Sequence, residues 1–187
     1  MRSSYQKNNY GEIFRAMVDA YKPINVVELG VLEGYSTVAI AEGLERNGRG
    51  MLKAYDLFED YPYRHAKHED VKAALARFPL IVEVIKMDAF EVYHSYSAST
   101  VDFLHVDLSN TGETVQRIMD QWDSKIVQGG VILFEGGTEE RDREDWMIKY
   151  DRPSIKREIE TNEIIQRRYI YGTYLKWPGL TMLLKKR

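Results

Sequence analysis

Five acidic residues stand at the ends of five apolar runs, and they are the side chains best placed for chemistry. They are Glu28, Asp56, Asp88, Asp107 and Glu135. In an open parallel sheet, ligands bind outside the carboxyl ends of the strands, so these side chains would face one crevice. A single acid of this kind often caps a helix, but capping does not readily explain all five. We therefore expect several of these carboxylates to contact a ligand.

The first acid belongs to the stretch VVELGVLEGYS, residues 26–36. Gly30 lets the chain turn, and Gly34 lets a ligand approach the backbone without meeting a Cβ atom. The spacing is not the G-x-G-x-x-G of dinucleotide-binding proteins, because Leu32 and Tyr35 interrupt it. An acid before the first glycine suits a ligand with positive charge, such as the ammonium and sulfonium groups of S-adenosylmethionine. A tight turn without any ligand is the other interpretation of this stretch.

Two further acids suggest particular roles. Asp56 ends the run AYD, where a carboxylate can accept hydrogen bonds from both hydroxyls of a ribose. Glu135 is a candidate general base, as is His94 if its loop reaches the crevice. His105 lies within a strand-like run and is expected to be a hydrogen-bonded core residue.

Helical and strand-like patterns alternate along the chain and predict the scaffold that positions these residues. A helix is expected before Pro23, and strands are expected at INVVEL, GMLKAYD, IVEVIKM, VDFLHVD and VILFE, with helices between them. This alternation is typical of right-handed crossovers and a parallel sheet covered on both faces. After a helix near SIKREIETNEII, RRYIYGTYLKW and GLTMLLKK are too close together for a crossover and must pair antiparallel. The prediction is a Rossmann-like, doubly wound, seven-stranded mixed α/β sheet in a single domain, residues 1–187.

Composition excludes several classes of protein. Apolar residues make up 44% of the 187, which argues against a disordered chain, and there is no cysteine for a disulfide or a thiolate metal site. The net charge of −3 gives no general attraction to nucleic acid. No run approaches the roughly 20 apolar residues of a membrane span. We expect a cytoplasmic protein with a small-molecule substrate and no nucleic-acid or membrane partner, as a monomer or a homo-oligomer.

ELGVLEGYS resembles the first motif of class I S-adenosylmethionine-dependent methyltransferases, closest to their small-molecule O-methyltransferase branch. VDFLHVD and GGVILFE resemble that family's fourth and fifth strands. The resemblance implies a single methyltransferase domain that binds S-adenosylmethionine and methylates a hydroxyl of a small molecule. It assigns Glu28, Gly30, Gly34 and Ser36 to the methionine part of the cofactor, Asp56 to the ribose, Leu57, Phe58, Asp88 and Ala89 to the adenine, and Asp107 to the neighbourhood of the reactive methyl.

The chain departs from the metal-dependent members of that family. Their pattern makes Asp107 and Glu135 candidate ligands of a divalent cation such as magnesium, with a third ligand after the fifth strand. Gly136 occupies that third position and has no side chain, so a bound cation is not favoured. Asn110 could fill in, although with Glu113 it also fits a helix-capping box. The Lys or His that often follows the acid of the fourth strand is missing, which leaves Asp107 and Glu135 as the candidate catalytic residues.

Two segments could border the crevice. Residues 136–154 include seven consecutive charged residues and form either a substrate-facing lid or a plain solvated loop. The N-terminal region, residues 1–22, carries Tyr5 and Tyr10 as a second candidate wall.

Three other functions stay open: an N-methyltransferase, an NAD-binding oxidoreductase, and a non-catalytic protein that binds S-adenosylmethionine.

Overall fold

The computed structural model describes residues 1–63 and 65–187, and the chain divides into two compact units, residues 1–94 and 95–187. Unit 1 alternates helices with three strands. Its elements are η1 (Ser4–Asn8), α1 (Tyr10–Tyr21), β1 (Asn25–Leu29), α2 (Tyr35–Asn47), β2 (Met51–Asp56), η2 (Phe58–Asp60), α3 (His68–Leu75), β3 (Val82–Lys86) and η3 (Val92–Ser95). β1 pairs with β2 and β2 with β3, in both cases parallel. Each parallel pair is joined by a helix, as a parallel connection requires.

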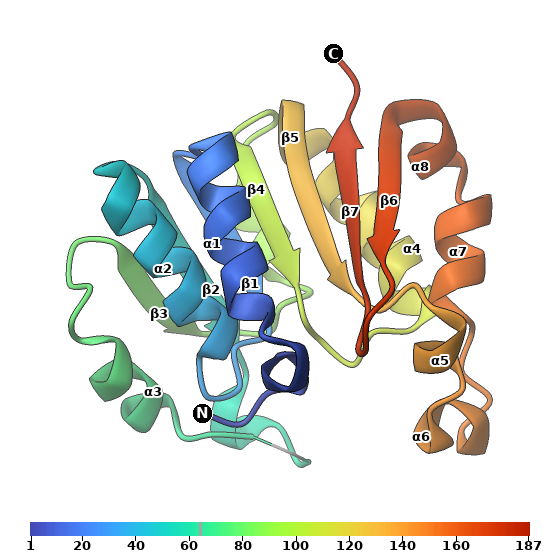
Figure 1. Cartoon of the computed structure of the whole chain (residues 1–187), viewed down its shortest axis with the longest axis horizontal. Helices are drawn as coiled ribbons and strands as arrows, with labels where there is room; N and C mark the ends of the chain where they lie inside the picture. Colours follow the sequence, from blue (N-terminus) through green and yellow to red (C-terminus); the bar gives the residue numbers. More distant parts are fainter. Residues whose placement is uncertain (64) are drawn as a thin grey trace. The chain divides into compact units, whose positions relative to one another are not determined.

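The helices α1 and α2 pack side by side in unit 1 (Figure 1). Gly43 of α2 explains their closeness, because a Cβ atom there would come 2.8 Å from the Cβ of Val18 on α1. The N-terminal segment adds Tyr5 and Tyr10, whose rings are fully buried and lie 5.1 Å apart between centroids. The prediction that these two rings form a wall of the crevice is therefore wrong. They are core residues that fix the start of α1.

Unit 2 holds the remaining four strands. Its elements are β4 (Val101–Val106), α4 (Gly112–Trp122), η4 (Asp123–Lys125), β5 (Ile126–Glu135), α5 (Glu139–Asp142), α6 (Asp145–Lys149), α7 (Ile155–Thr161), α8 (Glu163–Arg168), β6 (Tyr169–Tyr174) and β7 (Leu180–Lys185). β4 and β5 are parallel, whereas β7 is antiparallel to both β5 and β6. The seven strands have the order β3-β2-β1-β4-β5-β7-β6. This confirms the mixed, mostly parallel α/β sheet with an antiparallel pair at its end.

Two local features differ from the sequence prediction. β5 begins at Ile126 rather than near Val131, and its pairing with β4 jumps from Val101–Ile126 to Phe103–Val131. The irregularity contains Gly129, whose φ of 75° suits a glycine. The single helix expected near SIKREIETNEII is divided in two, because the Asn162 side chain accepts hydrogen bonds from two amides at the start of α8.

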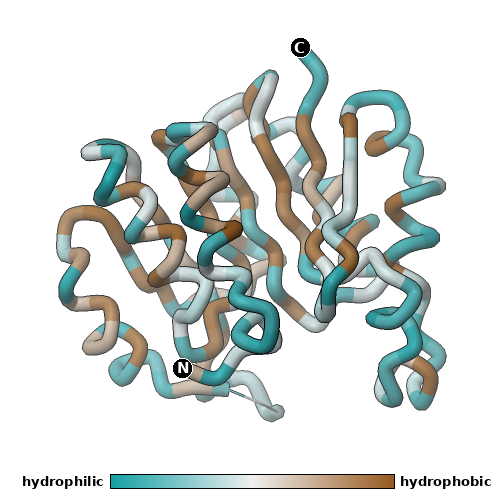
Figure 2. The backbone as a smooth tube through the Cα atoms, viewed as in Figure 1, coloured by the Kyte–Doolittle hydropathy of each residue, from teal (hydrophilic) through white to brown (hydrophobic). Residues whose placement is uncertain are grey.

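The hydrophobic residues of unit 2 are concentrated in its strands, and β5 is hydrophobic along most of its length (Figure 2). From Gly130 to Glu135 every residue of β5 is buried, as expected for a strand covered on both faces. Only residues 127–129, near its start, are partly or fully exposed. α4 contributes Ile118, Met119 and Trp122, all fully buried. In the part of the chain that the structure describes, no helix is both long and apolar enough to span a membrane.

Candidate functional site

The turn between β1 and α2 has a left-handed backbone at three of its residues. Gly30 and Gly34 have φ of 90° and 85°, and Leu32 has φ of 51°. This conformation is easy for glycine but strained for leucine, so the surroundings must hold Leu32 in place. Gly34 also precedes the first residue of α2, where free backbone N–H groups are available. The turn therefore presents backbone to a ligand.

Glu28 lies below this turn and is completely buried. Its two carboxylate oxygens accept hydrogen bonds from the hydroxyls of Ser36, at 2.5 Å, and Thr37, at 2.6 Å. Hydrogen bonds to a charged acceptor are among the strongest in proteins, so these two join the end of β1 to the first turn of α2. The structure thus places Glu28 and Ser36 together, with Glu28 holding the turn in shape from beneath. A direct contact of either side chain with the cofactor remains a prediction.

Asp56, at the end of β2, holds the turn from the other side. Its Oδ2 accepts hydrogen bonds from the amides of Val31, at 2.7 Å, and Leu32, at 3.0 Å, while Oδ1 accepts from the amide of Phe58, at 2.8 Å. A carboxylate offers about four lone-pair positions, and three are used here. Asp56 therefore stabilises the strained Leu32 and retains acceptor capacity for about one more donor.

The residues predicted beside the adenine differ in their exposure. Leu57 is partly buried, whereas the Phe58 ring is completely buried and lies 4.8 Å from the His68 ring in the core around α3. Asp88 is exposed, and its Oδ1 accepts the amide of Phe90 at 2.9 Å. Ala89, beside it, is buried. Leu57 and Asp88 are thus better exposed to a ligand than Phe58, and the assignment of all four residues to the adenine remains a prediction.

In unit 2, Asp107 and Glu135 follow the ends of two neighbouring parallel strands. Val106 pairs with Phe134, so the two acids come next at the same level of the sheet. Asp107 is partly exposed, but Glu135 is buried and forms an ion pair with Arg141 of α5, whose Nε lies 2.8 Å from Oε1. Arg141 is buried too, and its guanidinium carbon lies 5.2 Å from the ring centre of Trp146. The cation that Glu135 faces in this structure is therefore an arginine.

Asn110 connects the same two strand ends. Its side-chain Nδ2 donates to the carbonyl oxygens of Val106 and Glu135, both at 3.0 Å. The expectation that Asn110 caps the following helix is wrong, because the cap of α4 is Thr111, which accepts the amide of Thr114. The Asn110 side chain is fully buried, and its Oδ1 has no hydrogen-bond partner among residues 1–63 and 65–187.

The donor set at Asp107 and Glu135 does not fit a hard divalent cation. Such a cation needs six or more oxygens, yet Gly136 offers no side chain and Glu135 is paired with Arg141. Oδ1 of Asn110 has no partner within the described residues, but one amide oxygen does not replace these missing ligands. Across the described residues, no group of three or more His, Cys, Asp and Glu side chains is arranged to hold a metal ion. The assignment of Asp107 and Glu135 as metal ligands stays a prediction that the donor chemistry disfavours.

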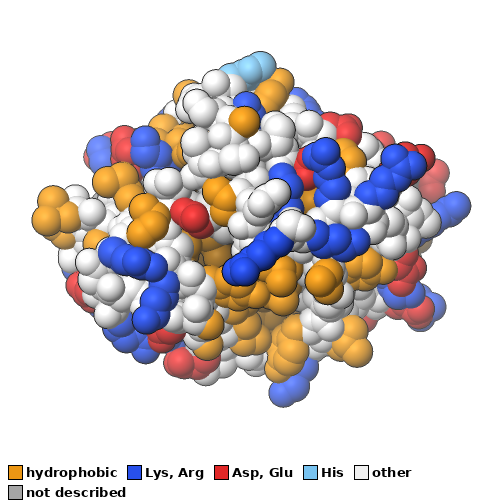
Figure 3. Space-filling model, turned by 90° about the horizontal axis from the view of Figure 1, so that it is seen from above, with side chains coloured by type: hydrophobic (Ala, Val, Ile, Leu, Met, Phe, Trp, Pro, Cys, Tyr) orange, Lys and Arg blue, Asp and Glu red, His pale blue; other side chains and the backbone are white. Residues whose placement is uncertain are grey.

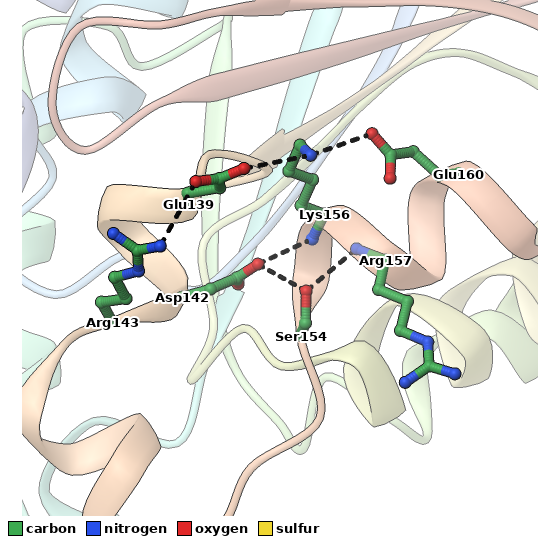
Figure 4. A pocket seen from close by; sticks show the side chains of 7 residues that line it. All are labelled: Glu139, Asp142, Arg143, Ser154, Lys156, Arg157 and Glu160. Atoms are coloured by element: carbon green, nitrogen blue, oxygen red, sulfur yellow. Dashed lines mark hydrogen bonds and ion pairs between the residues drawn. The ribbon is translucent and has the colours of Figure 1, made fainter.

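The segment after β5, residues 136–154, is helical rather than a plain loop. It contains α5 and α6, and both lie beyond the carboxyl end of β5 (Figure 1). Asp142 fastens α5 to α7, because its carboxylate accepts the Ser154 hydroxyl at 2.6 Å and the amides of Ile155 and Lys156 (Figure 4). A surface hollow of about 200 Å³ lies at this junction, but Glu139 and Glu160 both pair with Lys156 across it. We interpret the junction as structural, and a lid role for the segment remains a prediction.

The histidines give the site no clear base. His105 is fully buried within β4, as expected for a core residue. His94 is exposed and lies 3.9 Å from Glu91. Sequence patterns did not single out Thr37 or Arg141, whereas Trp146 was a reason to consider the segment a lid. Arg141 lies in a run of seven charged residues, a pattern typical of a solvent-exposed loop. The one sequence signal for its ion pair with Glu135 is that the two residues are six positions apart.

Comparison with known proteins identifies the family. Residues 27–135 match the family described as "Methyltransferase domain", which is more than half of the chain. The chain therefore belongs to this methyltransferase family, and the predicted family is confirmed. No curated protein matched the sequence.

Solved structures show the same fold at low sequence identity. An O-methyltransferase from Bacillus cereus, crystallised with S-adenosylhomocysteine, is 18% identical with a TM-score of 0.70, over 99% of this chain and 84% of that one. TomG of Streptomyces achromogenes, in complex with S-adenosylmethionine, is 15% identical with a TM-score of 0.68, over 96% and 80%. A methyltransferase from Geobacter sulfurreducens is 12% identical with a TM-score of 0.69, over 96% and 79%.

Proposed function

We propose that this protein is an S-adenosylmethionine-dependent methyltransferase that transfers a methyl group to a hydroxyl of a small molecule. The observation that carries the proposal is the β1–α2 turn of unit 1, held by Glu28 from below and by Asp56 from the end of β2. The family match and the cofactors named for the Bacillus cereus and Streptomyces achromogenes enzymes support it.

The residues of unit 1 fit this cofactor. Gly30 and Gly34 allow a close approach to the backbone, and Asp56 can accept about one ribose hydroxyl beside its three amides. Asp88 is exposed and can accept a hydrogen bond from an adenine amine. When bound, the cofactor supplies a methyl group already activated by a sulfonium centre. The protein's contribution is then mainly to bind and position the reactants and to exclude water.

The catalytic roles of Asp107 and Glu135 remain predictions. The pairing of Glu135 with Arg141 makes it a poorer candidate for the base than the sequence suggests, since the pair has to separate before Oε1 can receive a proton. Transfer to nitrogen and binding without turnover are the competing functions. A panel of phenols, sugars and amines, with turnover of the cofactor as the readout, distinguishes the three.

Calorimetry tests the cofactor directly. S-adenosylmethionine or S-adenosylhomocysteine should bind at micromolar concentration, about −8 kcal/mol. Asp56→Ala should weaken that binding by about 2–4 kcal/mol, through loss of the ribose contact and of the hold on Leu32. The matched control is Asp60→Ala, which removes an exposed acid that pairs with Lys86. Tight NAD binding with no response to either methyl-donor form would refute the proposal, and unchanged affinity in Asp56→Ala would remove that residue from the site.

A further inference from the structure

Arg141 is a buried cation that is only partly used. Its exposed fraction is 5%, and Nε is the one guanidinium nitrogen that donates to a described side chain, Glu135. Nη1 is buried without a hydrogen-bond partner among residues 1–63 and 65–187. An unpaired buried donor loses its hydrogen bonds to water without replacement, and the loss is larger when the group is charged. Native proteins keep few such groups, so this one calls for a functional explanation.

The contacts of Arg141 leave a particular edge of the guanidinium available. Glu135 binds at Nε, and the guanidinium carbon lies over the Trp146 ring, 5.2 Å from its centre. Neither contact uses the edge formed by the two Nη atoms. That edge presents two parallel N–H groups, which match the two oxygens of a carboxylate. A neutral carbonyl oxygen would satisfy fewer of these donors.

The position of this edge agrees with a substrate contact. Arg141 lies on α5, just beyond the carboxyl end of β5, and ligands of open α/β sheets bind at the carboxyl ends of the strands. Glu135 compensates the charge of Arg141 while the ligand is absent, which allows the arginine to stay buried. The burial of Arg141 keeps most water away from the guanidinium and strengthens its interaction with an incoming charge. Nη1 is covered in this structure, so a ligand reaches it only if the short α5–α6 segment moves.

Resting on the proposed function, we propose that the acceptor substrate of this methyltransferase carries a carboxylate, and that the Nη edge of Arg141 binds it. Glu135 and Trp146 are then positioning residues that orient the guanidinium. The substrate class is a small hydroxy acid rather than a neutral alcohol or phenol.

Matched pairs of probes test this inference by binding alone. 4-Hydroxybenzoate, salicylate and 3-hydroxybutyrate are each titrated against the alcohol that replaces the carboxylate, with and without S-adenosylhomocysteine. At least one acid should bind about tenfold or more tightly than its alcohol. Arg141→Lys keeps a charge for Glu135 but removes the two-nitrogen edge, so it should abolish this preference. Arg143→Lys is the matched control, because Arg143 is exposed and pairs only weakly with Glu139 at 3.5 Å.

The outcomes separate this inference from the proposed function. Equal binding of acid and alcohol in every pair, or a preference that survives in Arg141→Lys, overturns the inference even if the cofactor binds. Failure of the cofactor to bind overturns the proposed function, whereas a carboxylate preference that depends on Arg141 would still stand. If Arg141→Lys does not fold, the double variant Glu135→Leu/Arg141→Met removes the pair together, and it should likewise lose the preference.

Discussion

Two buried carboxylates lie at opposite ends of β5 and are held in different ways. Asp123, near the amino end, accepts hydrogen bonds from Arg168 and from the hydroxyl of Tyr169, at 3.0 Å, and lies 3.4 Å from Lys185. Glu135, at the carboxyl end, has one cationic partner within residues 1–63 and 65–187, which is Arg141. Both side chains are more than nine-tenths buried.

The two ends differ in the number of side chains that hold each acid. At the Asp123 end, Lys185 also donates to the carbonyl oxygen of Ile126, at 3.0 Å, and Arg168 is largely exposed to water. Lys and Arg side chains are frequent on the right-hand part of the view from above, where α8 and the end of β7 lie (Figure 3). At the Glu135 end, Nη1 of Arg141 and Oδ1 of Asn110 are buried without partners within the described residues. Nε1 of Trp122, the residue before Asp123, also lacks a partner within the described residues, so unpartnered atoms occur near both ends. The ends differ instead in that three side chains hold Asp123, whereas Arg141 alone among the described cations pairs with Glu135.

Removing Asp123 should have the largest effect on stability. Asp123→Ala leaves the Tyr169 hydroxyl and Lys185 without their acid, so the free energy of unfolding should fall by about 3 kcal/mol. Chemical denaturation monitored by circular dichroism measures this. Glu163→Ala is the control, because its pair with Arg167 is exposed and contributes about 0.5 kcal/mol or less. A loss below 1 kcal/mol in Asp123→Ala would show that the two ends of β5 do not differ as described.

Removing the Glu135–Arg141 pair should have a much smaller effect. In Glu135→Leu/Arg141→Met, apolar side chains of similar size replace a buried ion pair whose Nη1 is unsatisfied. Such replacements are often neutral or stabilising, so we expect a change between about 0 and +1 kcal/mol in the free energy of unfolding. The same denaturation experiment measures it. A loss as large as that of Asp123→Ala would mean that the pair is mainly structural.

The smallest effect should appear at alkaline pH. Burial raises the pKa of Tyr169 far above its usual value near 10, and the charge of Asp123 adds to the shift. The folded state therefore holds the phenol proton more tightly than the unfolded state does. The resulting stabilisation is complete below pH about 10 and is lost as the pH rises above it. Thermal melts between pH 8 and pH 11 should show a smaller alkaline decrease for Tyr169→Phe than for the wild type, and parallel curves would contradict this.

The order and type of the strands could be predicted from the sequence because their signal is local. Apolar runs alternate with helical spacing, and the short gap around Pro178–Gly179 forces the last two strands to pair antiparallel. The start of β5 was misplaced because Gly129 and Gly130 look like a turn. In the structure they lie within a strand, where Gly129 is part of an irregular pairing.

The site was predicted less completely because its contacts are long-range. The spacing of Glu28, Gly30 and Gly34 predicted the turn between β1 and α2, and the structure has that turn. Their contact with a cofactor remains a prediction. The pairing of Arg141 with Glu135 could not be predicted, since a charged side chain in a charged run gives no sign that it is buried. Asp56 was expected to serve a ribose, yet the structure shows it engaged with the backbone of the turn, a role that no property of its neighbours in sequence indicates.

Because Asp56 accepts the amides of Val31 and Leu32, the ELGVLEGYS segment does not contain every residue that stabilises its own turn. The conformation of Leu32 depends on a carboxylate that lies 24 residues later in the chain, at the end of the neighbouring strand. A graft of this segment onto another strand would carry its glycines and Glu28, but not the acceptor that holds Leu32 in its left-handed conformation. A graft into a different scaffold therefore has to include β2 up to Asp56. The shortest segment that keeps the turn in this conformation is β1, α2 and β2 together.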